Sequence, residues 1–68
     1  MTNIDLLEDK IHASGLKKGY IAEKIGVSPS TFSALLSNKA EFKARQIKEI
    51  CKILNIKDNA EIRAIFFA

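Results

Sequence analysis

The chain has 68 residues, of which 47% are hydrophobic and 28% are charged, and its formal net charge is +3. This length supports one small domain, and such a domain buries only about 60% of the surface that its unfolded chain exposes, so its margin of stability is narrow. One cysteine and one histidine exclude an internal disulfide and a zinc site built from several such ligands. The mild positive charge agrees with a nucleic-acid partner without requiring one.

Membrane insertion and export are not expected from this sequence. No apolar run approaches the roughly 18 residues that a membrane helix needs. The first five residues, Met1 to Asp5, lack a basic region followed by an apolar stretch, so they do not resemble a signal peptide. A cytoplasmic protein with one reduced thiol is the simplest interpretation.

The first predicted helix runs from Ile4 to Ser14, where apolar residues recur at helical spacing on one side. Thr2 or Asn3 is expected to cap its first turn, and Gly15 is expected to end it.

The next two predicted helices are separated by a tight turn. One runs from Lys18 to Ile25, and Gly26 after it can adopt the left-handed conformation that ends a helix. Ser28 then offers a capping oxygen to a helix that runs from Pro29 to Ser37, with proline at its first position. This order of signals is typical of a helix-turn-helix, which presents its second helix to a DNA groove.

A loop is predicted over Asn38 to Glu41, where asparagine tolerates the left-handed conformation. The helix that follows, from Ala44 to Leu54, has the cleanest apolar stripe in the sequence. Asn55 is the expected cap at its C-terminal end.

The last predicted helix continues to Phe66, and Asp58 and Glu61 have the spacing of a capping box at its start. Five short helices joined by short loops predict an all-α fold, a compact five-helix bundle forming a single domain over residues 1–68.

The strongest motif in the sequence extends from Leu16 to Lys39. Its residues are Leu16, Ile21-Ala22-Glu23-Lys24-Ile25-Gly26-Val27-Ser28, Ser30-Thr31-Phe32-Ser33 and Leu35-Leu36-Ser37-Asn38-Lys39. This segment resembles the helix-turn-helix of the Cro/C1-type family of small phage and bacterial transcriptional regulators, and with its flanking helices the resemblance covers nearly the whole chain. It implies a lambda-repressor-like fold and sequence-specific binding of operator sites in double-stranded DNA.

The outer face of the third predicted helix is the expected reader of DNA bases. At about 100° per residue this face lies opposite Phe32 and Leu35. The residues expected to face the bases are Ser28, Ser30, Thr31, Ser33, Ala34 and Ser37. Serine discriminates bases weakly, and alanine can contact a thymine methyl group. The family usually places Gln, Asn, Arg or Lys here, so part of the specificity is expected from DNA shape. The alternative is a merely polar helix face.

Basic and polar residues flank this helix, and the resemblance implies that they contact the phosphate backbone. The candidates are Lys17, Lys18, Asn38, Lys39, Lys43 and Arg45. Each phosphate contact would increase the salt dependence of binding. For any single lysine, the alternative is a solvated surface charge.

The C-terminal end is a second candidate contact surface. A small bundle has little room for Phe67 beside Ile65 and Phe66, and an exposed aromatic end suggests contact with a partner. In the family, the fifth helix often forms a homodimer, which would set two recognition helices about 34 Å apart. The alternative is a tail that folds back over the core.

Other classes of function have less support in the sequence. His12 is expected on the surface and Cys51 on a buried stripe, so no catalytic residues, metal site or cofactor are expected. The main alternative to a DNA-binding regulator is a protein-interaction module of the same fold, either antitoxin-like or a modulator that binds a larger repressor as a second regulator protein.

Overall fold

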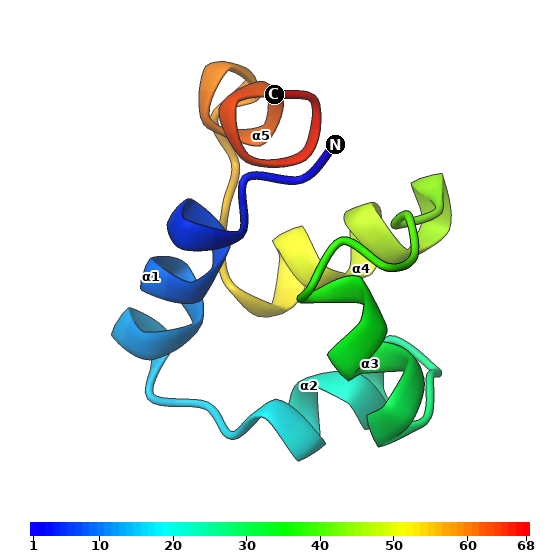
Figure 1. Ribbon diagram of the computed structural model, residues 1–68. Helices are drawn as coiled ribbons and strands as arrows, with labels where there is room; N and C mark the ends of the chain where they lie inside the picture. The colour runs from blue at the N-terminus through cyan, green and yellow to red at the C-terminus, as the bar shows by residue number, and fades with distance from the viewer.

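The computed structural model describes residues 1–68 and consists of five α-helices and their connections. The helices are α1 (Ile4–Ser14), α2 (Lys18–Lys24), α3 (Pro29–Leu35), α4 (Ala44–Ile53) and α5 (Asn59–Phe66). α4 crosses the middle of the molecule, with α2 and α3 at one pole and α5 at the other (Figure 1). The predicted all-α fold with five helices is confirmed. None of these helices combines the length and apolar character that crossing a membrane requires.

α2, α3 and α4 all end in the same hydrogen-bonded motif. A residue with positive φ follows each helix: Gly26 (78°), Asn38 (60°) and Asn55 (58°). The next residue donates its N–H to a carbonyl five positions earlier: Val27 to Ala22 at 3.0 Å, Lys39 to Ala34 at 2.9 Å, and Ile56 to Cys51 at 2.8 Å. These are Schellman motifs. Because they tighten the last turn, the helices end one or two residues before the predicted ends.

Side-chain caps begin α1 and α3 as predicted. Asn3 Oδ1 accepts the Leu6 N–H at 3.2 Å. Ser28 Oγ accepts the Thr31 N–H at 3.1 Å, and Pro29 occupies the first position of α3, where an N–H would lack a helical partner. Each cap of this kind is worth about 1 kcal/mol.

The capping box predicted at the start of α5 is wrong. Asp58 is the capping residue but its side chain makes no cap hydrogen bond. The Glu61 carboxylate instead pairs with Lys10 Nζ on α1 at 2.7 Å. At the start of α4, Gln46 Oε1 accepts the Lys43 N–H at 2.9 Å, which satisfies a backbone donor that has no partner within the helix.

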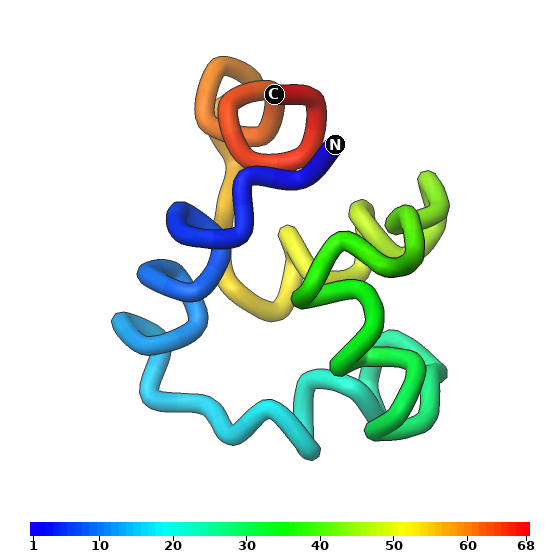
Figure 2. The backbone as a smooth tube through the Cα atoms, in the orientation of Figure 1, coloured from blue at the N-terminus to red at the C-terminus, as the bar shows by residue number.

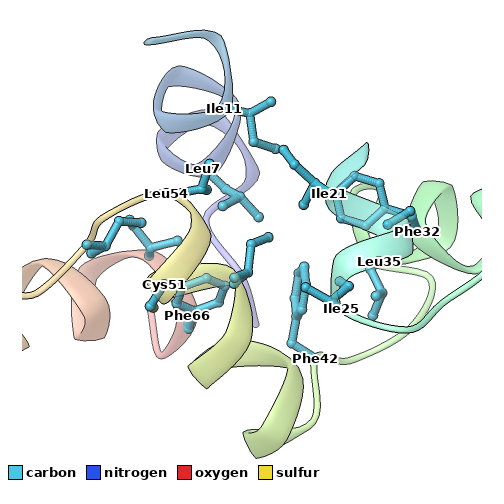
Figure 3. Close-up of a cluster of buried hydrophobic side chains, with 14 residues drawn as sticks. Leu7, Ile11, Ile21, Ile25, Phe32, Leu35, Phe42, Cys51, Leu54 and Phe66 are labelled. Atoms are coloured by element: carbon cyan, nitrogen blue, oxygen red, sulfur yellow. The ribbon is translucent and has the colours of Figure 1, made fainter. Parts of the chain in front are cut away.

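One hydrophobic core joins the five helices (Figure 3). Its buried members are Leu7, Ile11, Ile21, Ala22, Ile25, Phe32, Leu35, Phe42, Ile50, Cys51, Leu54, Ile56, Ile65 and Phe66. Full burial of one of the large aliphatic or aromatic side chains contributes about 1.5–3 kcal/mol, so this cluster is the main source of stability.

The N-terminal segment is tied to two distant parts of the chain. Asn38 Nδ2 donates to Thr2 O at 3.0 Å, and its Oδ1 accepts the Thr2 N–H at 3.3 Å. The Asn3 N–H donates to Ile65 O on α5 at 2.6 Å. We call these three bonds the N-terminal clasp. Figure 2 shows the resulting path, in which the first residues pass beside α5.

Phe42 anchors the loop between α3 and α4. Its side chain is buried and meets the Phe66 ring edge-on, with ring centroids 5.4 Å apart. Edge-to-face aromatic pairs contribute about 0.5–1.5 kcal/mol beyond the area they bury. The loop that follows α3 is therefore held against α5 by packing as well as by the clasp.

Asn38 and Asn55 both have positive φ, but only the Asn38 side chain belongs to the N-terminal clasp, so substitutions at the two positions should differ in their effect on stability. Asn38→Gly is expected to lower the free energy of unfolding by about 1–3 kcal/mol, because two hydrogen bonds to Thr2 are lost. Asn38→Ala should lose about 1 kcal/mol more, because alanine is strained at positive φ. Asn55→Gly is the matched control and should change stability by less than about 0.5 kcal/mol, since the Asn55 side chain makes no hydrogen bond. Urea unfolding measures all three, and equal losses at both asparagines would contradict the role of the clasp.

The buried thiol of Cys51 should make the free energy of unfolding depend on pH in the alkaline range. Burial raises the pKa of the Cys51 thiol above its ordinary value of 9.0, and the negative charge of Glu61 raises it further. Above that ordinary value the unfolded chain loses the proton while the folded chain keeps it, so the free energy of unfolding should fall as pH rises. Cys51→Ala should lower stability at neutral pH but show a shallower decline in alkali. Urea unfolding at a series of pH values compares the two slopes, and identical slopes would contradict the prediction.

Candidate nucleic-acid interface

α2 and α3 form a helix-turn-helix that depends on the shared core. Each has seven residues, too few to be stable alone in water. Ile21 and Ile25 from the first helix pack with Phe32 and Leu35 from the second, and all four are buried (Figure 3). Val27 lies half-buried at the corner. Because the inner side of α3 is fixed in this way, its opposite side faces outward.

The residues expected to face DNA lie on that outward side. Ser28, Ser30, Thr31, Ser33 and Ser37 are exposed, and Ala34 is half-buried. Their hydroxyls differ in whether they are already hydrogen-bonded within the protein.

Three of the five hydroxyls already make hydrogen bonds within the protein. Ser28 Oγ donates to Thr31 Oγ1 at 3.0 Å while it caps the helix. Ser37 Oγ donates to the carbonyls of Ser33 and Ala34 at 3.0 and 3.2 Å. The Ser30 and Ser33 hydroxyls have no partner within the protein. These two are therefore the hydroxyls with both donor and acceptor capacity free for another molecule.

The candidate phosphate contacts have different surroundings. Lys17, Lys39 and Lys43 are exposed and take part in no ion pair. Lys18 Nζ pairs with Glu8 Oε2 on α1 at 3.0 Å, so a phosphate would have to displace that carboxylate. Arg45 is exposed, and its guanidinium Nη2 would lie 4.0 Å from a Cβ at Gly26, beside the turn.

Asn38 differs from the other candidates because its side chain is occupied. Both the amide oxygen and the amide nitrogen bind the Thr2 backbone in the N-terminal clasp. The role expected for this side chain, a phosphate contact, conflicts with that arrangement. Its partner lies 36 positions away in the chain, so local sequence reasoning had no signal for it.

A groove of about 320 Å³ lies between α1, α2 and α3. Glu8, Lys18, Gly19, Ser33 and Ser37 contribute to its lining. A Cβ added at Gly19 would meet no atom within 4 Å, so glycine leaves this part of the groove open without relieving any steric conflict.

The expected dimer residues separate into two kinds. Ile65 and Phe66 are 1% and 4% exposed, so they belong to the core of the protomer and offer no surface to a partner. Phe67 is 64% exposed and is the one of the three that is free to make an outside contact. Both lie on the inner side of α5, where the Ile65 carbonyl accepts the Asn3 N–H and the Phe66 ring meets Phe42.

A model of the helix-turn-helix family matches residues 9–59, which is more than half of the chain. The protein therefore belongs to the Cro/C1-type helix-turn-helix family and is a DNA-binding regulator of transcription. No curated protein and no solved structure matches the chain.

Gly19 yields a prediction about stability within this motif. Gly19→Ala should raise the free energy of unfolding by about 1 kcal/mol, because alanine is the better helix former and the added Cβ meets no atom. For a domain of this size, that corresponds to a rise in Tm of about 4–8 °C.

Gly15→Ala is the matched control for Gly19→Ala. A Cβ at Gly15 also meets no atom within 4 Å, but its φ of +73° is strained for alanine, so stability should fall. Thermal unfolding followed by circular dichroism distinguishes the two, and a destabilised Gly19→Ala protein would show that the glycine has a structural role in α2.

Proposed function

We propose that this protein binds operator DNA as a homodimer, with α3 in the major groove, and represses transcription in the cytoplasm of a bacterial cell, from a prophage or a small operon. The observation that carries the proposal is the orientation of α3, whose inner side is buried through Phe32 and Leu35 while its outer side presents free hydroxyls at Ser30 and Ser33. Family membership supports DNA binding. The small outer side chains let the helix approach base edges closely.

Base recognition is assigned mainly to Ser30 and Ser33, with Ala34 available for contact with a thymine methyl. Ser28, Thr31 and Ser37 complete the groove-facing set, mainly by shaping and capping the helix. Because serine accepts and donates equally well, this set gives modest direct readout. Part of the sequence preference is therefore assigned to the shape and deformability of the operator.

Phosphate contacts are assigned to the unpaired lysines Lys17, Lys39 and Lys43, which fix the register of the protein on the duplex. Lys18 joins them by exchanging the Glu8 carboxylate for a phosphate. Arg45 is a peripheral contact beside the turn.

Dimerisation is assigned to the pole of α5. Phe67 and Met1 are the most exposed large apolar side chains, at 64% and 73%, and they stand near the two chain ends. Figure 2 shows these ends close together beside α5. An apolar contact there would repeat the same surface in both protomers, as a two-fold dimer requires.

The test begins with selection of bound sequences from a randomised duplex library, followed by binding to the selected duplex as salt is raised. Lys18→Ala should weaken binding to all sequences about equally. It should also make the negative slope of log affinity against log salt shallower by about 0.9, because one phosphate contact is lost. Ser33→Ala should instead change the order of preferred sequences, because it removes a free hydroxyl from the base-facing side. Fluorescence anisotropy with selected and mixed duplexes measures both effects.

Two variants serve as controls in the same assay. Glu8→Gln should strengthen binding to all sequences, since it removes the carboxylate that competes for Lys18. Ser37→Ala should change sequence preference less than Ser33→Ala, because the Ser37 hydroxyl is bonded to the helix backbone. No binding to any duplex at low salt would overturn the proposal and favour a module that binds another protein.

A further inference from the structure

A second groove lies on the side of the molecule formed by α4 and α5. It has a volume of about 370 Å³ and lies between α4, the connection after it, and α5. Its apolar lining comes from Ala44, Ile47, Cys51, Ile56 and Ile62. Ile47 and Ile62 are only half-buried, so the groove leaves part of two isoleucine side chains in contact with water.

Three lysines surround this apolar lining. Lys48, Lys52 and Lys57 line the groove and are exposed. None of them forms an ion pair, since the two salt bridges of the protein involve Lys10 and Lys18. The positive charge along the groove is therefore unpaired within the chain.

The Glu61 carboxylate, next in sequence to the groove residue Ile62, already has a partner within the protein. Its side chain is held by Lys10 Nζ on α1 at 2.7 Å. The Cys51 thiol is neutral at neutral pH, since burial raises its pKa further above an ordinary value of 9.0. The floor of the groove is thus uncharged and its rim is positive.

We propose that this groove binds an acidic, amphipathic helix of a partner protein, with apolar residues on the isoleucines and carboxylates against the lysines. The residues of α4 that line it form two parallel rows at a spacing of four, with Ile47 and Cys51 in one and Ala44, Lys48 and Lys52 in the other. Apolar and charged stripes that run side by side match the two stripes of an amphipathic helix.

The same observations disfavour two other occupants. A nucleic-acid backbone would pair with the lysines but has no apolar stripe to cover Ile47 and Ile62. A second copy docked on the same groove through a two-fold axis would place the three lysines of each protomer against one another, which is repulsive.

The proposed docking groove is separate from the DNA-facing surface. None of its lining residues belongs to the set assigned to bases or phosphates. The peptide and DNA assays therefore probe different residues, and the two functions are tested independently.

The test uses the ¹⁵N-labelled full chain and a synthetic helical peptide of about four turns, with leucine at helical spacing on one side and glutamate on the other. The peptide should shift amide resonances of α4 and the start of α5 and leave those of α3 unchanged. Replacing its leucines by serine, or its glutamates by lysine, should weaken binding at least tenfold, because each change removes one of the two complementary stripes.

Charge-reversal variants of the protein test whether the lysines that line the groove contribute to peptide binding. Lys52→Glu should weaken peptide binding at least fivefold, whereas Lys24→Glu, which makes the same charge change on α2, should have less than a twofold effect. Both lysines are exposed, so neither substitution disturbs the core. Equal losses of peptide affinity in both variants would show that the peptide responds only to the net charge of the protein, and would overturn the proposal.

Three other results would also overturn the proposal. Shifts confined to α2 and α3 would place the peptide elsewhere. A short DNA duplex that shifts the groove resonances as the peptide does would identify a nucleic-acid contact. Shifts at the groove that grow with protein concentration alone would identify self-association.

Discussion

The structure depends on the packing of two helices that are too short to stand alone. α2 and α3 each have seven residues, and their relative orientation is set by Ile21, Ile25, Phe32 and Leu35 within the common core. The core thereby determines which side of α3 faces outward. α1, α4 and α5 act as a scaffold that completes this core, and the binding surface is a product of tertiary packing more than of local helix propensity.

Contacts at both ends of α3 fix the position of this helix. Ser28 caps its first turn, while Asn38 and Phe42 fasten the chain after it to the N-terminal segment and to Phe66. If α3 binds DNA as proposed, a helix held at both ends loses little conformational entropy on binding, which favours affinity even where individual side-chain contacts are weak. This arrangement suits a helix whose outer residues are small.

The features that were predictable from the sequence are those governed by neighbouring residues. Ser28 with Pro29, and the left-handed Gly26, Asn38 and Asn55, follow from turn chemistry within a few residues, and the structure confirms them. Contacts between distant positions were not predictable in this way. The partner of Asn38 is Thr2, and the partner of Glu61 is Lys10, which removes the expected capping box. Burial of Ile65 and Phe66 agrees with the apolar spacing of the last helix, whereas the partner of the Phe66 ring, Phe42, lies far away in the sequence and was not predictable.

The N-terminal clasp brings the two ends of the chain together. The bond from the Asn3 N–H to Ile65 O joins the first residues to the last helix, and both ends lie at the pole of α5, opposite α2 (Figure 1). Any polypeptide joined to either end would therefore emerge beside Phe67 and away from α2. A fused domain or a second copy linked in tandem would be tethered at that pole, leaving the helix-turn-helix unobstructed.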